Sequence, residues 1–388
     1  MGEKVAIIGL GQTDHKYIRP DIDHEELINQ AVRLALEDAD LTIRDIDAVI
    51  MDNMDLFEGH YLADAMSVDG AGMYMKQGLK INTGGTSGAS AVAAGWHHVA
   101  SGLFKKVLVV GWQKQDAAPS IAALVTAREP FYDRGMAAGA VGIFATMGLR
   151  YMQESGCGEE PAALARVIMA DNARRNPHAH LKLNLTVDEV LKSRVLVWPV
   201  RLLHMSPTSC GACALVLGDE ASARRSPKRP VWIKDSVTAH REQSVWRGGC
   251  VEPIPTTTAL EVAAAKLYKR NGITNPARDI DLWELYTPSS WALFSWMELY
   301  SICDKGQAWR LVEKEAIRIE GEIPIEPSGG VVSTNPIGAS GVIRVAEAAL
   351  QLRGEAGERQ VTKKAETAVA AAWGACHWIV NFLLSRNA

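Results

Sequence analysis

The sequence lacks an excess of either charge and has no cluster of basic residues. Its 388 residues include 41 Lys and Arg against 45 Asp and Glu, which gives a net charge of −4. Proteins that bind nucleic acid or an anionic membrane surface carry a basic patch, so we expect neither partner. Apolar residues make up 47% of the chain and charged residues 22%. That balance is typical of a globular protein with a filled core, and it excludes a disordered or fibrous chain.

Cysteine is scarce and scattered, with six residues in the whole chain. Cys210 and Cys213 have the C-x-x-C spacing of a zinc site, but a structural zinc site needs four ligands and no second pair accompanies them. We therefore expect no metal in this chain. A disulfide scaffold is not indicated at this length, and we expect a reducing, cytoplasmic location.

Long apolar runs are rare as well. Residues 5–9 are typical of a buried strand and lack the features of a signal peptide. Residues 367–384 are nearly apolar and long enough to raise the question of a membrane helix, but Gly374, His377 and Asn381 interrupt the run. We predict two buried strands joined by a turn there, and no membrane-spanning segment.

What the sequence does contain is an internal duplication. Residues 25–38 have the pattern of an amphipathic helix, and a polar turn with the tripeptide 45–47, Asp-Ile-Asp, leads from them to an apolar strand. Residues 259–269 are followed in the same way by the tripeptide 279–281, again Asp-Ile-Asp, and a second apolar strand. Both copies therefore predict a helix, a turn and a strand.

The duplication continues into two helices rich in small residues. One begins at Thr86 and precedes the strand 106–112, and the other begins at Gly338 and precedes the apolar segment 366–374. Apolar strands that alternate with helices predict an α/β fold whose sheets are covered on both faces. The glycine-rich openings have two interpretations: close packing of the two helices between sheets, or backbone N–H groups that bind anionic oxygen at helix N-termini.

Residues 113–207 differ in character and predict an excursion from this duplicated core. They contain a helix from about Ala138 to Glu154 and the polar run 174–182, which is rich in Arg, His and Lys. Those charges would suit a phosphorylated ligand, and a solvated surface explains them equally well.

Taken together, several segments resemble the thiolase superfamily over essentially the whole chain. These segments are residues 107–114, 186–194, 207–217, 327–330 and 335–341. The resemblance implies two duplicated βαβαβαββ halves in a five-layer αβαβα sandwich, with a loop domain over the coenzyme A site. It places the N-terminal half at residues 1–112 and 208–235, the loop domain at 113–207 and the C-terminal half at 236–388.

Thiolases make or break a carbon–carbon bond beside a thioester, using a nucleophilic cysteine, an oxyanion hole and an acid/base group. In this sequence the resemblance places Gly85 at the nucleophile, Asn335 at the catalytic histidine, Tyr286 at the active-site asparagine and Ala372 at the second cysteine. A glycine cannot be acylated, and an amide does not exchange a proton near neutral pH. The usual catalytic groups are therefore absent from their usual positions.

Other cysteine and histidine residues that could serve in catalysis lie near those positions in the sequence. Cys376 and His377 follow the second cysteine position, and Cys210 follows His204 by six residues. A thiolate beside an imidazolium could serve as a relocated nucleophile, whereas cysteines in apolar strands are often simply buried.

Tyr286 offers another route, since its phenol could take the proton of a β-hydroxyl while Asn335 supports the thioester oxygen. Acyl-CoA contacts are expected at Gly85, Ser87, Gly338 and His204.

Three functions remain open. The first is retro-Claisen cleavage of a branched or aromatic 3-oxoacyl-CoA, such as benzoylsuccinyl-CoA, with a relocated cysteine. The second is retro-aldol cleavage of a 3-hydroxyacyl-CoA, and the third is a non-catalytic subunit of a heteromeric complex. Coenzyme A enters as part of the substrate, and no cofactor is expected in this chain.

The resemblance to thiolase-like sterol side-chain aldolases and benzoylsuccinyl-CoA thiolase also implies partners. It implies a homodimer core with a small zinc-ribbon/OB-fold (DUF35-type) subunit, in which any zinc would be held. We expect the dimer to form through edge strands, with residues 107–110 as candidates.

Overall fold

The computed structural model describes residues 2–126, 134, 139–240, 258–374 and 378–388. Two of the candidate catalytic residues, Cys376 and His377, lie outside these ranges.

Nine strands form the central sheet, in the order β3-β2-β4-β7-β1-β8-β11-β10-β9. The elements of the first half are β1 (Val5–Gln12), α1 (His24–Asp38), β2 (Ala48–Asp52), β3 (Gln77–Ile81), α2 (Ser87–Ala100), β4 (Lys106–Lys114), β7 (Cys210–Asp219) and α7 (Glu220–Arg225). Those of the second half are β8 (Val231–His240), α8 (Ala259–Asn271), α9 (Pro276–Asp279), β9 (Leu282–Glu284), α10 (Ser290–Leu299), α11 (Ala308–Glu313), α12 (Ser340–Arg353), β10 (Thr367–Gly374) and β11 (Trp378–Ser385).

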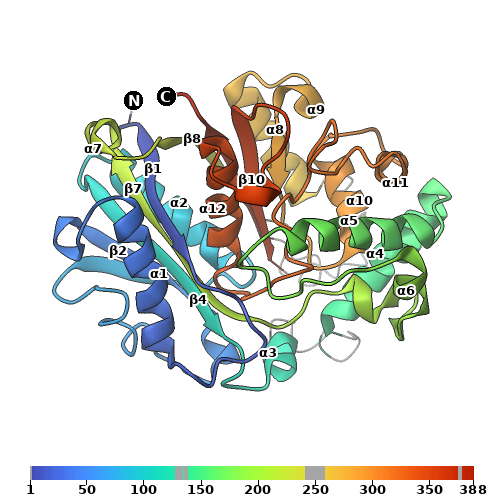
Figure 1. Ribbon diagram of the computed structural model, residues 1–388, viewed down its shortest axis with the longest axis horizontal. Helices are drawn as coiled ribbons and strands as arrows, with labels where there is room; N and C mark the ends of the chain where they lie inside the picture. Colours follow the sequence, from blue (N-terminus) through green and yellow to red (C-terminus); the bar gives the residue numbers. More distant parts are fainter. Residues whose placement is uncertain (1, 127–133, 135–138, 241–257, 375–377) are drawn as a thin grey trace, which may run out of the picture.

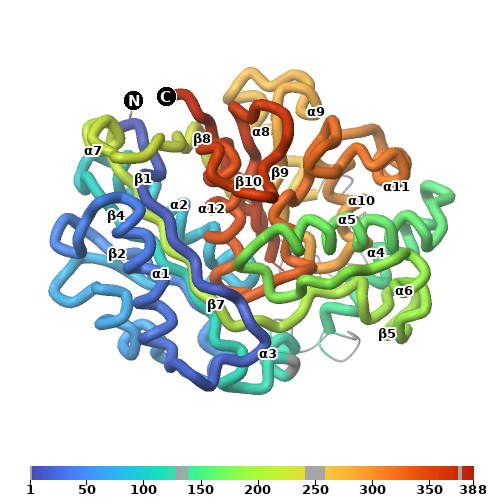
Figure 2. The backbone as a smooth tube through the Cα atoms, viewed as in Figure 1, coloured from blue at the N-terminus to red at the C-terminus, as the bar shows by residue number. Residues whose placement is uncertain are grey.

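The strand order confirms the duplication. The first half runs β3-β2-β4-β7-β1, and the second runs β9-β10-β11-β8 with Ile325 bridged in parallel to Trp283 at the place of β3. In the first half β3-β2 and β2-β4 are parallel, and β4-β7 and β7-β1 are antiparallel. In the second half β9-β10 is likewise parallel, and β10-β11 and β11-β8 are antiparallel. Among the described residues, three residue pairs between β1 and β8 join the two halves of the sheet, and the halves lie side by side in Figure 2.

The repeated tripeptide has the same structural role in both halves. Asp47 Oδ2 accepts hydrogen bonds from the backbone N–H groups of Lys105 and Lys106 at the start of β4. Asp281 Oδ2 accepts them from Glu366 and Thr367 at the start of β10. Each aspartate therefore fixes where the next strand begins.

The chain packs in five layers around three large hydrophobic clusters, of which the central one surrounds a pair of helices. Along β4, Leu108 and Val110 face the core beneath α1, whereas Val107 and Val109 face a central core shared with α2, α12 and the second half. The other side of the second half packs against α8 and α10. The order of layers is thus helix, sheet, helix pair, sheet, helix, as expected from the thiolase resemblance (Figure 1).

The small-residue helices α2 and α12 pack closely in the central layer. A Cβ atom at Gly88 would lie 2.7 Å from the backbone nitrogen of Val342 in α12. Glycine therefore allows the two backbones to approach, as the packing interpretation expects.

Between β4 and β7 the chain makes the predicted excursion. Its elements are α3 (Ser120–Thr126), α4 (Gly139–Ser155), α5 (Glu160–Arg174), α6 (Val187–Lys192), β5 (Val195–Val197) and β6 (Val200–Arg201). Helices α4 and α5 pack against α10 of the second half (Figure 1). The predicted domain boundary at residue 235 falls inside β8, the strand that joins the halves; the domain division stays a prediction.

The expectation that residues 107–110 form a dimer edge is wrong. They belong to β4, which is hydrogen-bonded to β2 on one side and to β7 on the other. Strand order depends on crossovers that chain order does not reveal. Among the strands that the structure describes, the first half of the sheet ends at β3, whose one neighbour is β2.

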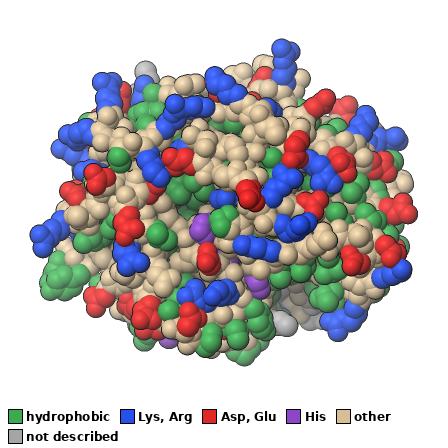
Figure 3. All heavy atoms as spheres, in the orientation of Figure 1, with side chains coloured by type: hydrophobic (Ala, Val, Ile, Leu, Met, Phe, Trp, Pro, Cys, Tyr) green, Lys and Arg blue, Asp and Glu red, His purple; other side chains and the backbone are tan. Residues whose placement is uncertain are grey.

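The apolar run near the C-terminus forms β10 and β11, as predicted. In the described ranges no helix has both the length and the apolar character needed to cross a bilayer. On the face drawn in Figure 3, acidic and basic side chains are interspersed.

Candidate active site

Gly85, at the turn into α2, lies against the ends of two strands of the other half. A Cβ atom there would lie 2.7 Å from the carbonyl oxygen of Trp373, 3.4 Å from Cα of Gly374 and 3.5 Å from the hydroxyl oxygen of Tyr286. The first distance is shorter than van der Waals contact with a backbone atom. A cysteine at this position would require the end of β10 to move.

Asn335 is the centre of the polar contacts at this place. Its Nδ2 donates to Ser206 Oγ (3.3 Å), and its Oδ1 accepts from Ser340 Oγ (2.9 Å) and, at 3.5 Å, from the Tyr286 hydroxyl. Its backbone N–H donates to Ser209 Oγ (3.0 Å). These contacts fix the amide so that its second Nδ2 hydrogen is available to an oxygen of a ligand.

Tyr286 follows β9 and is buried, with 4% of its surface exposed. Burial raises the pKa of its hydroxyl above the ordinary value, although the Arg344 guanidinium opposes the effect. The Trp296 indole donates to the Tyr286 carbonyl (2.8 Å) and fixes the backbone. At neutral pH the site therefore presents a neutral phenol.

His180 is a member of this site that the sequence did not single out. Its Nδ1 lies 2.9 Å from Ser209 Oγ, the oxygen that also accepts from Asn335. Burial lowers the pKa of His180. His180 belongs to the polar run noted for its charges, but contact with residue 209 arises only in the folded chain.

The surroundings of Cys210 do not favour a thiolate. Its thiol is buried and donates to the Tyr17 carbonyl (3.4 Å), and burial raises its pKa to about 11. Catalytic cysteines have a lowered pKa, near cationic groups or helix N-termini.

His204 is also fully buried. Its Nδ1 accepts from the Arg201 backbone N–H (3.2 Å), and burial lowers its pKa to about 4. The hydrogen bonds of the described residues do not link His204 to Cys210.

The expected acyl-CoA contacts at the two helix openings are already engaged within the protein. Ser87 Oγ donates to the Gly84 carbonyl (2.7 Å) and accepts from the Thr83 N–H (2.9 Å). The Gly338 N–H donates to Gln113 Oε1 (3.2 Å). Both groups thus shape the turns that carry Gly85 and Asn335.

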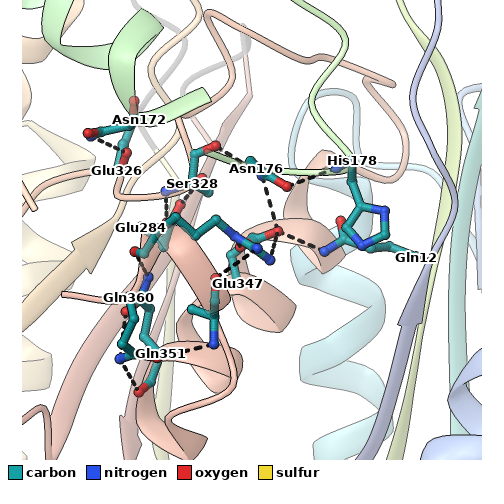
Figure 4. Close-up of polar contacts among 12 residues, drawn as sticks. Gln12, Asn172, Asn176, His178, Glu284, Glu326, Ser328, Glu347, Gln351 and Gln360 are labelled. Carbon is teal, nitrogen blue, oxygen red and sulfur yellow. Dashed lines mark hydrogen bonds and ion pairs between the residues drawn. The ribbon is translucent and has the colours of Figure 1, made fainter. Parts of the chain in front are cut away.

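A buried polar network lies behind the site (Figure 4). Ser328 donates through its N–H and its hydroxyl to Glu284 (3.0 and 2.8 Å), which also pairs with Arg344. Asn172 of α5 and Asn176, two residues after its end, donate to the carbonyls of Glu326 and Ser328 (3.1 and 3.0 Å). The loop 326–330, which leads to Asn335, is therefore held from both sides.

Two carboxyl groups of this network are protonated more readily than usual. Burial raises the pKa of Glu284 to about 7, against the opposing charge of Arg344, and raises that of Glu326 to about 8. In the described ranges no group of three or more His, Cys, Asp or Glu side chains is arranged to hold a metal ion.

Comparison with known proteins identifies the family. Residues 5–146 match the model of the thiolase N-terminal domain, and residues 250–381 match that of the thiolase C-terminal domain-like family. An acetyl-CoA acetyltransferase of Methanothermobacter thermautotrophicus is 32% identical over 92% of this chain and 93% of its own length. The chain belongs to the thiolase family, whose members include such acyltransferases.

More distant relatives extend the comparison. Sterol carrier protein 2 of Gallus gallus is 27% identical over 93% of this chain and 68% of its own length. The solved structure of the Ltp2-ChsH2(DUF35) aldolase has a TM-score of 0.83 at 21% identity and covers 98% of this chain and 97% of its own. A monomeric SCP2-thiolase like protein from Mycobacterium smegmatis has a TM-score of 0.73 at 17% identity, covering 99% and 77%. These structures confirm the thiolase fold.

Proposed function

We propose that this protein is an acyl-CoA carbon–carbon lyase of the aldol type, which cleaves or forms the C2–C3 bond of a 3-hydroxyacyl-CoA. The observation that carries the proposal is the contact of Gly85 with Trp373 and Tyr286. It leaves no room for a nucleophilic side chain and puts a phenol beside the Asn335 amide. An aldol reaction needs no acylated residue. The Tyr286 phenol suits its proton transfer, and the Asn335 amide suits the negative charge of its enolate.

In the cleavage direction the Tyr286 phenolate takes the proton of the C3 hydroxyl. The C2–C3 bond then breaks, its electron pair passes to the thioester as an enolate, and C3 becomes a carbonyl. Asn335 Nδ2 donates to the enolate oxygen, which is the role of an oxyanion hole. The Tyr286 phenol then gives its proton to C2, which completes the acyl-CoA product and restores the phenolate.

Formation of the bond reverses these steps. The Tyr286 phenolate takes the C2 proton, the enolate attacks the carbonyl carbon, and the phenol so formed protonates the C3 alkoxide.

The test is turnover of 3-hydroxyacyl-CoA thioesters without added free coenzyme A, by purified protein and by its Tyr286→Phe variant. We expect the variant to lose about a hundredfold or more in rate, the range of general acid–base catalysis. Tyr268→Phe is the matched control, because Tyr268 is a buried tyrosine that donates to the Tyr300 carbonyl (2.7 Å). Equal rates for Tyr286→Phe and the wild type would refute the proposal.

Retro-Claisen cleavage of a branched or aromatic 3-oxoacyl-CoA, with benzoylsuccinyl-CoA as one example, is the second candidate. Gly374 lies beside Gly85, and Cys376 follows it by two residues in the sequence. A cysteine carried by that segment could take the acyl group in place of residue 85. Cleavage that requires free coenzyme A and forms an acyl–enzyme on Cys376 would support this candidate.

A non-catalytic role is distinguished by the same assays. Such a subunit would show no turnover with either class of thioester, and activity would appear only when a second thiolase-like chain is added.

The proposed assembly is a cytoplasmic homodimer with a small DUF35-type zinc-ribbon/OB-fold subunit, which would hold any zinc. The aldolase of similar fold contains a DUF35 protein, as its name states, and that supports the second partner. The free side of β3 supports the homodimer, because large apolar side chains are exposed on and before this strand. They are Leu56, Tyr61, Leu62, Met66, Tyr74, Met75 and Leu79.

A further inference from the structure

Arg166, on α5, is a fully buried arginine that has no carboxylate partner among the described residues. Its Nε donates to the Leu203 carbonyl (2.9 Å) and its Nη1 to Ser333 Oγ (3.4 Å), both neutral acceptors. Within the described ranges, no acidic side chain forms an ion pair with it. Burial lowers the pKa of Arg166 to about 10, which leaves the guanidinium charged at neutral pH. Buried charges are ordinarily paired, because their desolvation is costly.

Two further buried donors lie next to this guanidinium. His204 follows Leu203, and its ring meets Trp291 edge-on at a centroid distance of 6.0 Å. Since His204 Nδ1 accepts a hydrogen bond, the proton of the neutral ring is on Nε2. The Pro199 carbonyl faces the ring, but no acceptor of the described residues lies within hydrogen-bond geometry of His204 Nε2 or Trp291 Nε1.

The donor cluster, by which we mean Arg166, His204 and Trp291, therefore has more hydrogen-bond donors than acceptors and a net positive charge. A water molecule could accept the hydrogen bonds of these donors, but it would not neutralise the positive charge of Arg166. A carboxylate satisfies both, because its two oxygens accept from guanidinium N–H groups in a planar arrangement.

The neighbours of the donor cluster pack closely on one side. A Cβ atom at Gly148 of α4 would lie 3.0 Å from the Trp291 ring and 3.1 Å from Pro199. A planar carboxylate is smaller than a phosphate group, so its binding would displace these neighbours less.

The donor cluster and the active-site amide both contact two segments, residues 203–206 and 333–335. Arg166 contacts Leu203 and Ser333, while Asn335 Nδ2 contacts Ser206. A ligand whose thioester oxygen is held by Asn335 thus has its acyl group next to segments 203–206 and 333–335. Helices α4 and α5 pack over α10, which begins at Ser290, so entry of the carboxylate requires these helices to shift.

We propose that Arg166, His204 and Trp291 bind a carboxylate on the acyl group, so that the substrate is the coenzyme A thioester of a dicarboxylic acid. This rests on the proposed action on acyl-CoA and defines its substrate class. No residue of the cluster is required for the proton transfer itself. Arg166 is accordingly a specificity-determining residue.

The test compares thioesters that differ only by the carboxylate. Binding of succinyl-CoA against butyryl-CoA, and of glutaryl-CoA against valeryl-CoA, is measured by calorimetry for the wild type, Arg166→Lys and Arg166→Gln. In at least one pair we expect the wild type to bind the acidic thioester at least about tenfold more tightly, as for a charged hydrogen bond. Arg166→Gln should reduce the preference to within about twofold, and Arg166→Lys should retain part of it, because the charge remains without the planar fork.

The outcomes separate this inference from the proposed function. If the uncharged thioesters bind the wild type as tightly as the acidic ones in both pairs, the carboxylate site is refuted while action on acyl-CoA survives. If none of the four thioesters binds, both are refuted. Because the wild-type comparison is decisive by itself, a variant that fails to fold leaves the test of the carboxylate site intact.

Discussion

The carbonyl oxygen of Trp373 lies 2.7 Å from the point that a Cβ atom of residue 85 would occupy. These residues come from different halves of the duplicated fold, Gly85 before α2 and Trp373 in β10. The glycine at residue 85 is therefore matched by the shape of the surrounding backbone, and a cysteine there would require that backbone to move.

This contact predicts the result of Gly85→Cys. We expect the variant to gain no thiolase activity and to lose about 1–3 kcal/mol of stability, as in overpacked cores. Denaturant unfolding measures the loss, and mass spectrometry after incubation with an acyl-CoA detects acylation. Gly158→Ala is the control, since nothing lies within 4 Å of a Cβ atom there, and its stability should remain within about 0.5 kcal/mol. An acylated, fully stable Gly85→Cys protein would contradict the prediction.

The raised pKa of Tyr286 predicts the same pH dependence for both directions of reaction, because the overall reaction neither takes up nor releases a proton. Burial holds the phenol protonated, so the phenolate fraction, and with it kcat/KM of cleavage, should rise about tenfold per pH unit from roughly pH 6 to 9. Addition passes through the same protonation states in reverse, so its kcat/KM should rise in parallel. Initial rates at low substrate concentration measure both profiles. A cleavage rate that falls with rising pH would exclude Tyr286 as the base.

Cysteine substitutions separate the aldol reaction from the retro-Claisen candidate. We expect Cys210→Ala and Cys376→Ala to retain the cleavage rate within about twofold, because neither thiol takes part in an aldol reaction. The Cys210 thiol is buried and its pKa is raised to about 11, so it remains a thiol. Steady-state rates and intact mass under turnover provide the measurement. A loss of a hundredfold or more in Cys376→Ala alone, with an adduct on that residue in the wild type, would establish the second candidate instead.

The β3 edge predicts how the homodimer can be disrupted. Tyr61 and Met75 are 88% and 87% exposed, in the segment that leads to β3. We expect the double variant Tyr61→Asp/Met75→Asp to sediment as a monomer at micromolar concentration, because buried charges without partners oppose an interface. Leu202→Asp, at an exposed residue of the segment between β4 and β7, should remain dimeric. A wild-type protein that is monomeric at this concentration would refute the proposed dimer.

The sequence predicted the fold well because the signals that define it are local. The two Asp-Ile-Asp tripeptides marked equivalent turns, and the structure gives Asp47 and Asp281 the same hydrogen bonds. The edge strand was predicted wrongly, because the crossovers that place β4 inside the sheet and β3 at its end are not visible in the order of the elements along the chain.

By itself, therefore, the sequence determined the duplicated α/β architecture, for which periodicity suffices. That Gly85 stands at the nucleophile position is what the thiolase resemblance implies, and it stays a prediction. Only the tertiary structure decided which groups meet: Gly85 with Trp373, His180 with Ser209, and Arg166 with no carboxylate among the described residues. Some of these residues are hundreds of positions apart in the sequence. Close contact between their backbones and the desolvation of a buried charge arise only when the layers pack together.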